Sequence, residues 1–186
     1  DAKLKTFVQK HFKDYSADLF SVFMYRNFGF CTQDGYSAFM TPNVWMFIKS
    51  YEKLREYIID NKGISSLVQI AKGSFYREAT VDVMSFVLSS KKTNLDGLYV
   101  RLEDFKKDMS VQEIEFLKVL SMKDSRYLYK KASTIFNKIP GSPIAYWVSE
   151  NVIVSFKDNK LIKDFVTASV GIQTGNNDKF IRFWWE

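Results

Sequence analysis

The sequence of 186 residues is long enough to bury a hydrophobic core, as one domain or as one domain with part of another. Its hydrophobic share of 46% and aromatic share of 17% exclude a disordered chain, because disordered segments are poor in aromatic residues. The formal net charge of +6, from 27 basic and 21 acidic residues, suits nucleic acid or an anionic membrane as a partner, although many basic proteins are merely soluble.

The sparse cysteine and histidine content limits both the chemistry and the compartment. Cys31 is the only cysteine, so no internal disulfide can form, and we predict a reducing, cytoplasmic location. One histidine and one cysteine cannot supply the ligands of a structural zinc site, and no metal is predicted. No apolar run approaches the roughly 18 to 20 residues of a membrane span. The sequence starts without methionine or a signal-peptide centre, and we interpret it as a piece of a longer protein.

Two helices are predicted at the start of the chain. Apolar residues at helical spacing predict the first helix over Ala2–Phe12. Ser16 is expected to cap the second helix, which extends to Phe30 and is apolar around most of its circumference. A helix of that composition is expected to lie between a sheet and another element.

A strand is predicted next, over Tyr36–Thr41. The turn signal Asp34-Gly35 precedes it, and Pro42 ends it because proline cannot donate a ladder hydrogen bond. The strand shows little polar alternation, which is typical of a parallel strand covered on both faces.

A helix and two strands complete the first half. Ser50 is expected to cap a helix over Tyr51–Asp60, and Gly63 suits the end of that helix. Strands are predicted near Ser66–Ile70 and over Val81–Ser89. The loop between these strands is too short for a helical crossover, so we expect an antiparallel pair.

The second half begins at a predicted boundary at residues 91–94. Beyond it, Leu98–Leu102 is predicted as an edge strand, and a capping box at Ser110 opens a helix over Val111–Leu120. A basic helix is predicted over Arg126–Ile139.

The last part of the chain follows the helix-ending pair Pro140-Gly141. A strand is predicted over Tyr146–Val154 and a short helix over Asn159–Val166. The end of the sequence is rich in turn residues and then abruptly aromatic.

The sequence contains no complete catalytic constellation. His11 lies in a lysine-rich helix, where a surface position is expected, and Cys31 ends an apolar helix, where a buried structural thiol is expected. The segment Gly171–Gly175 lacks the Gly-Lys-Ser/Thr ending of a P-loop and no strand-turn-helix pattern surrounds it. The acidic residues show no pairing that suggests glycosidase or two-metal chemistry.

One loop has a composition of interest. It places Phe75-Tyr76 at the tip of a predicted hairpin, between Lys72 and Arg77. Loop aromatics often fold back onto the core of a protein. The alternative is an aromatic platform for a nucleobase, flanked by cations that bind phosphates.

Five segments, in their order and spacing, resemble parts of one enzyme family. They are Asp18–Phe23 (DLFSVF), Asp34–Trp45 (DGYSAFMTPNVW), Tyr51–Glu56 (YEKLRE), Ile70–Phe75 (IAKGSF) and Val81–Leu88 (VDVMSFVL). Together they resemble the second half of a gamma-class, N6-adenine-specific DNA methyltransferase. Such an enzyme transfers a methyl group from S-adenosylmethionine to adenine in DNA.

The end of the chain, Val170–Trp185, looks like the start of a target-recognition region. There it is most similar to the large methyltransferases of BREX-type phage-defence systems and to fused, type IIG restriction-modification enzymes. The resemblance implies an α/β fold, the C-terminal half of a Rossmann-like methyltransferase sheet that ends in an antiparallel hairpin. It also implies three parts: the catalytic half over 1–92, a connecting helical region over 93–139 and the truncated target-recognition region over 140–186.

The resemblance implies roles for five residues. Phe75 matches the aromatic residue that stacks on the flipped-out adenine, and such stacking contributes roughly 1–3 kcal/mol. Leu19 and Phe23, one helical turn apart, match apolar side chains around the adenine of S-adenosylmethionine, with plain core packing as the alternative. Lys72 and Arg77 flank Phe75 as candidate contacts to double-stranded DNA.

The family's catalytic Asn-Pro-Pro-Tyr (or Phe) loop occurs nowhere in the sequence, and neither does its glycine-rich cofactor loop. We therefore predict an inactive fragment of a parent methyltransferase that works in restriction-modification or phage defence, with restriction or defence-system subunits as partners and no membrane. Two alternatives stay open. One is a DNA-binding module without catalysis, and the other is a protein-interaction domain that uses the aromatic tail Phe180–Trp185.

Overall fold

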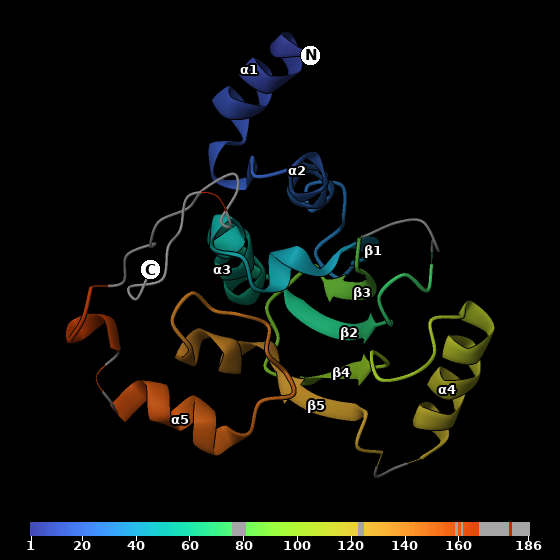
Figure 1. Ribbon diagram of the computed structural model, residues 1–186. Coiled ribbons are helices and arrows are strands. Elements are labelled where there is room, and N and C mark those ends of the chain that lie inside the picture. The colour runs from blue at the N-terminus through green and yellow to red at the C-terminus, as the bar shows by residue number, and fades with distance from the viewer. Residues whose placement is uncertain (76–80, 123–124, 159, 161, 168–178, 180–186) are drawn as a thin grey trace.

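A computed structural model describes residues 1–75, 81–122, 125–158, 160, 162–167 and 179 of the chain (Figure 1). Its centre is a five-stranded sheet with the strand order β1-β3-β2-β4-β5. The strands are β1 (Tyr36–Pro42), β2 (Gly63–Gln69), β3 (Val83–Ser89), β4 (Asp96–Arg101) and β5 (Leu128–Ala132). The fold is therefore α/β, as predicted.

The direction of the strands brings three carboxyl ends to one edge of the sheet. Both β1 and β2 pair antiparallel with β3, β2 pairs parallel with β4, and β4 pairs antiparallel with β5. Because β1, β2 and β4 therefore run in the same direction, the loops that follow them leave from the same edge (Figure 1).

The predicted antiparallel pairing of β2 with β3 is confirmed, but two other strand predictions are wrong. β1 was expected to be parallel and covered on both faces. It is an outer antiparallel strand on which buried Ser37 and Thr41 alternate with exposed Tyr36 and Met40. β4 was expected at the edge, yet it lies between β2 and β5, because β5 comes from a segment predicted to be helical.

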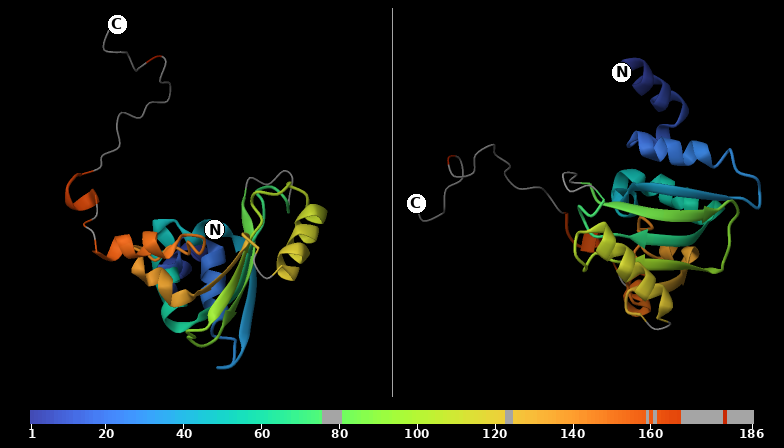
Figure 2. Two further views of the ribbon diagram at one scale, coloured as in Figure 1. Left: turned by 90° about the horizontal axis from the view of Figure 1, so that it is seen from below. Right: turned by 90° about the vertical axis from the view of Figure 1, so that its right-hand side faces the viewer.

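The described residues form five α-helices, which lie on both sides of the sheet. They are α1 (Ala2–His11), α2 (Leu19–Asn27), α3 (Glu52–Asn61), α4 (Met109–Ser121) and α5 (Glu150–Asp158). Seen from below, α4 lies alone on one side of the sheet, and α3 and α5 lie on the other (Figure 2). Among the described residues, no helix combines the length and the apolar character that a membrane span requires.

The helices begin at residues other than the predicted caps. Asp18 caps α2 in place of Ser16, and its carboxylate accepts from the backbone N–H of Phe20 at 3.4 Å. Asp108 caps α4 in place of Ser110. Both aspartates have an extended backbone conformation and the acceptor oxygen that a helix start needs. No side chain caps α3, so the prediction for Ser50 is wrong, and Gly63 begins β2 instead of ending a helix.

Two predictions in the second half are wrong because the segments pair or pack over long distances. The segment Arg126–Ile139, predicted to be helical, forms β5 against β4 and then the 3-10 helix Ser133–Lys138. The strand predicted over Tyr146–Val154 is replaced by an irregular segment followed by α5.

The main core lies on the face of the sheet that α3 covers. It includes fully buried Trp45, Leu54, Ile58, Leu67, Tyr99, Phe136 and Tyr146. A smaller cluster on the other face joins Val100 and Leu102 to Val119 of α4. β4 therefore contributes to the packing on both faces of the sheet.

Buried tyrosines predict a loss of stability at high pH. Burial raises the pKa of Tyr15 to about 12, and burial likewise raises the pKa of Tyr99 and Tyr146. In the unfolded chain these phenols ionise near pH 10, so the unfolded state loses protons that the folded state still holds. We therefore expect the free energy of unfolding to keep its full value below about pH 10 and to decrease as the pH rises further.

Urea denaturation at a series of pH values measures this loss. The variant Tyr146→Phe removes one buried phenol, so its free energy of unfolding is expected to fall less steeply above about pH 10 than that of the wild type. Equal slopes in the two proteins would show that the tyrosines do not cause the loss.

Candidate functional site

The candidate site lies at the edge where β1, β2 and β4 end, and the loop between β2 and β3 forms part of it. In open α/β sheets, ligands bind outside the carboxyl ends of the strands. At the return of the loop, the backbone N–H of Asn43 donates to the carbonyl of Asp82 at 2.9 Å. The ammonium of Lys72 lies 3.9 Å from the carboxylate of Asp82. The end of the loop is therefore bonded to the residue that follows β1, and the Lys72–Asp82 ion pair joins the two ends of the loop.

A tight turn positions Phe75 within this loop. The backbone N–H of Ser74 donates to the carbonyl of Ala71 at 3.1 Å, and Gly73 takes a φ of 73° that favours glycine. The Phe75 side chain is 40% exposed, so part of the ring reaches solvent. Buried Ser74 Oγ has no hydrogen-bond partner in the described part of the chain. A buried polar atom in that state is uncommon in folded proteins.

A polar cluster beneath the same edge was not predicted. Gln69, at the end of β2, is 2% exposed. Its amide donates to Glu103 at 2.6 Å and accepts from the Tyr146 hydroxyl at 2.8 Å. Glu103 also pairs with Arg101 at 2.7 Å, and the Arg101 guanidinium lies 4.6 Å from the ring centre of Trp147. The cluster joins the ends of β2 and β4 to the segment before α5.

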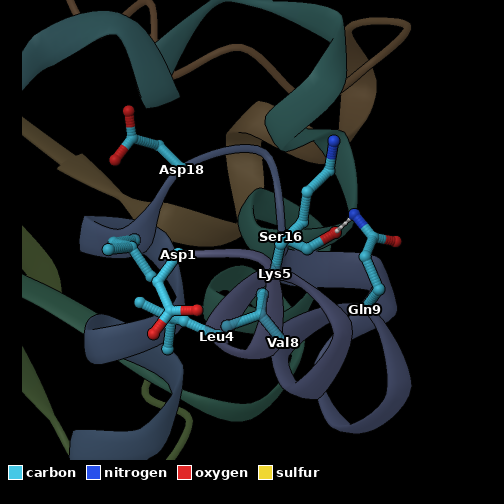
Figure 3. A pocket seen from close by; sticks show the side chains of 8 residues that line it. Asp1, Leu4, Lys5, Val8, Gln9, Ser16 and Asp18 are labelled. Carbon is cyan, nitrogen blue, oxygen red and sulfur yellow. Dashed lines mark hydrogen bonds between the residues drawn. The ribbon is translucent and has the colours of Figure 1, made fainter.

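The predicted cofactor residues lie on a different element, α2. Leu19 is 43% exposed and Phe23 is 70% exposed, so neither is a plain core residue. Leu19 lines a hollow of about 340 Å³ between α1 and the start of α2, and Phe23 is not part of its lining. Figure 3 shows Leu4 and Val8 at this hollow, together with charged and polar side chains.

The structure therefore places Phe75 and Lys72 together on one loop, and Leu19 and Phe23 together on α2. Arg77 and the tail Phe180–Trp185 lie outside the described residues.

His11 and Cys31, the two side chains considered as base and nucleophile, each contact a nearby residue. His11 is exposed on α1, and its ring packs against Phe7 with 4.6 Å between the ring centres. Cys31 Sγ lies 2.9 Å from the Ser37 hydroxyl and is half-buried. Within the described ranges, no three His, Cys, Asp or Glu side chains gather where they could hold a metal ion.

Comparison with known proteins shows what this chain is similar to. Residues 1–76 match the family model "Eco57I restriction-modification methylase". The described fold is similar to the methyltransferase subunit of a type I restriction-modification system from Streptococcus thermophilus. The TM-score is 0.54 with 10% identity, over 75% of this chain and 33% of that one. At that identity the likeness concerns the fold alone. The chain is thus similar to methyltransferases of restriction-modification systems.

Two relatives match almost the whole chain. The chain is 33% identical over 187 residues to the adenine-specific methyltransferase PglX of Lacticaseibacillus casei (strain Zhang), covering 98% of the chain. It is 33% identical over 190 residues to the adenine-specific methyltransferase BrxX of Escherichia coli O9:H4 (strain HS), covering 97% of the chain. The resemblance predicted from the sequence is confirmed. The chain spans 15% of the length of each of these relatives.

Proposed function

We propose that the chain is part of an S-adenosylmethionine-dependent DNA methyltransferase that methylates the N6 atom of adenine in restriction-modification or phage defence. The observation that carries the proposal is the 33% identity, over nearly the whole chain, to adenine-specific methyltransferases. The chain is a fragment of that enzyme and is inactive alone, because it contains no Asn-Pro-Pro-aromatic tetrapeptide.

The proposed architecture follows the predicted division. Residues 1–92 form the C-terminal half of a Rossmann-like catalytic domain, and 140–186 begin a target-recognition region. Residues 93–139 connect the two and add β4 and β5 to the sheet of the first. The hairpin of β2 and β3, with β3 inserted beside β1, supports the first of these assignments. The parent enzyme works in the cytoplasm with double-stranded DNA and with restriction or defence subunits.

Phe75 is the proposed platform for the target adenine. A base taken out of the duplex loses its stacking on its neighbours, and an aromatic ring restores about 1–3 kcal/mol of that loss. The 40% exposure of Phe75 leaves ring surface for this contact. Lys72, from the same turn, and Arg77 supply positive charge for the DNA phosphates. Ser74 Oγ adds a hydrogen-bonding group without a partner in the described part of the chain.

Leu19 and Phe23 fit one portion of the cofactor. Both are exposed apolar side chains one turn apart on α2, which suits contact with the flat adenine ring of S-adenosylmethionine. When bound, the cofactor supplies the methyl group. The role of Leu19 and Phe23 is to bind and orient its adenine and to keep water from that face.

A transfer experiment tests the proposed function. The parent protein is expected to move a radiolabelled methyl group from S-adenosylmethionine to DNA, and digestion should recover the label as N6-methyladenine. The isolated chain of 186 residues is expected to transfer none and to bind S-adenosylmethionine only weakly.

Three results would contradict these expectations. Label on cytosine would overturn the adenine assignment. Salt-sensitive DNA binding by a parent without transfer would favour the non-catalytic DNA-binding module. Micromolar binding of S-adenosylmethionine by the isolated chain, measured by calorimetry, would contradict its being a fragment without the main cofactor site.

A further inference from the structure

A buried glutamine of α4 holds the loop that carries Phe75. Gln112 is 1% exposed and uses its side-chain amide for three backbone groups. Its Oε1 accepts from the N–H of Ala71 at 3.1 Å. Its Nε2 donates to the carbonyls of Lys106 at 2.9 Å and Leu102 at 3.4 Å. One side chain therefore joins the loop after β2 to the loop after β4.

The hydrogen bond from Ala71 to Gln112 lies beyond the last residue of β2, where no strand pairing holds the backbone. β2 ends at Gln69, so the sheet's ladder does not extend to Ala71. The carbonyl of the same Ala71 then accepts from Ser74 and closes the turn that precedes Phe75. Gln112 thus holds the first residue of a short hydrogen-bonded path that ends at the residue next to Phe75.

Core packing alone does not explain an amide at this position. α4 faces the sheet with apolar side chains, including Val119 and Phe116, and a leucine or methionine would fill similar space. A glutamine offers an acceptor on one atom and two donors on the other, which suits one N–H and two carbonyls. A buried amide without hydrogen-bond partners would destabilise the fold. The three hydrogen bonds therefore account for a glutamine at this position.

From this geometry we infer that Gln112 is a positioning residue, which fixes the turn of Phe75 so that the ring is ready to receive a flipped-out adenine. The inference rests on the proposed function for the role of Phe75. It also gives a task to the predicted connecting region, residues 93–139, in which Gln112 lies. Because Gln112 is 1% exposed, its proposed role is to hold the backbone and not to contact the base.

The test compares two variants of the parent enzyme. Gln112→Met keeps the length of the side chain and removes all three bonds. Ser133→Ala is the matched control, because buried Ser133 accepts from the N–H of Ile64 at 2.9 Å and so holds the opposite end of β2. Gln112→Glu serves as a second variant that keeps the acceptor for Ala71 and loses the donors.

Two readouts are needed. Amide hydrogen exchange at residues 70–75 reports whether the turn is held, and it requires no methyltransferase activity. The backbone amides of residues 70–75 are expected to exchange faster in Gln112→Met than in Ser133→Ala. In Gln112→Glu the exchange rate at Ala71 is expected to rise less than in Gln112→Met. The second readout is methylation, in which Gln112→Met is expected to lower kcat roughly tenfold or more, since a misplacement of about 1 Å can cost 100-fold. Affinity for S-adenosylmethionine is expected to be unchanged.

Each outcome decides one point. Unchanged exchange at residues 70–75 in Gln112→Met would overturn the positioning role. Faster exchange with methylation equal to that of Ser133→Ala would show that the held turn does not serve the reaction. A wild-type parent without adenine methylation would overturn the proposed function, while hydrogen exchange would still decide whether Gln112 holds the turn.

Discussion

Replacing Phe75 by alanine in the parent enzyme is expected to lower kcat/KM for adenine methylation about tenfold to a hundredfold. The physical reason is the loss of one stacking surface of about 1–3 kcal/mol, where 1.36 kcal/mol corresponds to a factor of ten. Affinity for S-adenosylmethionine should be unchanged, because the proposed cofactor contacts, Leu19 and Phe23, lie on α2. Steady-state kinetics with labelled cofactor measures the first quantity and calorimetry the second.

Two further variants separate stacking from general damage to the protein. Phe75→Tyr keeps an aromatic face and is expected to retain most of the activity. Phe156→Ala removes a phenylalanine of similar exposure on α5, 38% against 40%, and is expected to behave like the wild type. Fluorescence of 2-aminopurine at the target position would report extrusion and stacking of the base directly. Unchanged kinetics in Phe75→Ala would refute the proposed role.

Replacing Arg55 by methionine is expected to cause the largest loss of stability of any single change considered. Arg55 lies on α3 and is 1% exposed. Its guanidinium donates to the carbonyl of Gly141 twice, at 2.7 and 2.9 Å, and to the carbonyls of Trp45 and Ile48 at 2.8 Å each. Burial lowers the pKa of this guanidinium, while Glu52 and Glu56 oppose that effect.

Arg55→Met leaves the carbonyls of Gly141 and Trp45 without this donor, while the carbonyl of Ile48 still accepts from the N–H of Tyr51. Each buried polar group left unsatisfied costs about 1–3 kcal/mol. We expect the free energy of unfolding to fall by about 3–5 kcal/mol, as measured by urea denaturation. Lys53→Met is the control on the same helix. Its ammonium is exposed and makes only a surface ion pair with Glu56, so little change is expected. A loss in Arg55→Met no larger than in Lys53→Met would contradict this account.

The elements that the sequence predicted well depend on local signals. The helix over Ala2–Phe12 and the antiparallel pair near Ser66–Ile70 and Val81–Ser89 follow from periodicity and from a short connecting loop. The elements that were wrong depend on distant partners. β5 exists because it pairs with β4, whereas the lysines of LYKKA on that strand favour a basic helix when only the local pattern is considered. Local patterns cannot reveal such pairing.

The candidate site shows the same division. Phe75 and Lys72 could be found because an aromatic pair between basic residues is visible in the sequence. Gln112 could not, because it acts on Ala71 across 41 positions. The pair Gln69 and Glu103 is separated by 34 positions and was missed for the same reason. Polar residues that support a site from neighbouring elements become apparent only when the sheet brings them together.

The hydrogen bonds of Arg55 have a consequence for how the chain folds during synthesis. Two of its four acceptor contacts are to Gly141, which follows 86 positions later. A ribosome that adds about 5–20 residues per second needs roughly 4–17 s to cover that distance. Throughout this interval the Arg55 guanidinium can donate to Trp45 and Ile48 but not to Gly141, so we expect it to stay partly in water, since burying an incompletely paired charge is unfavourable. The core around α3 therefore closes only after residue 141 has emerged.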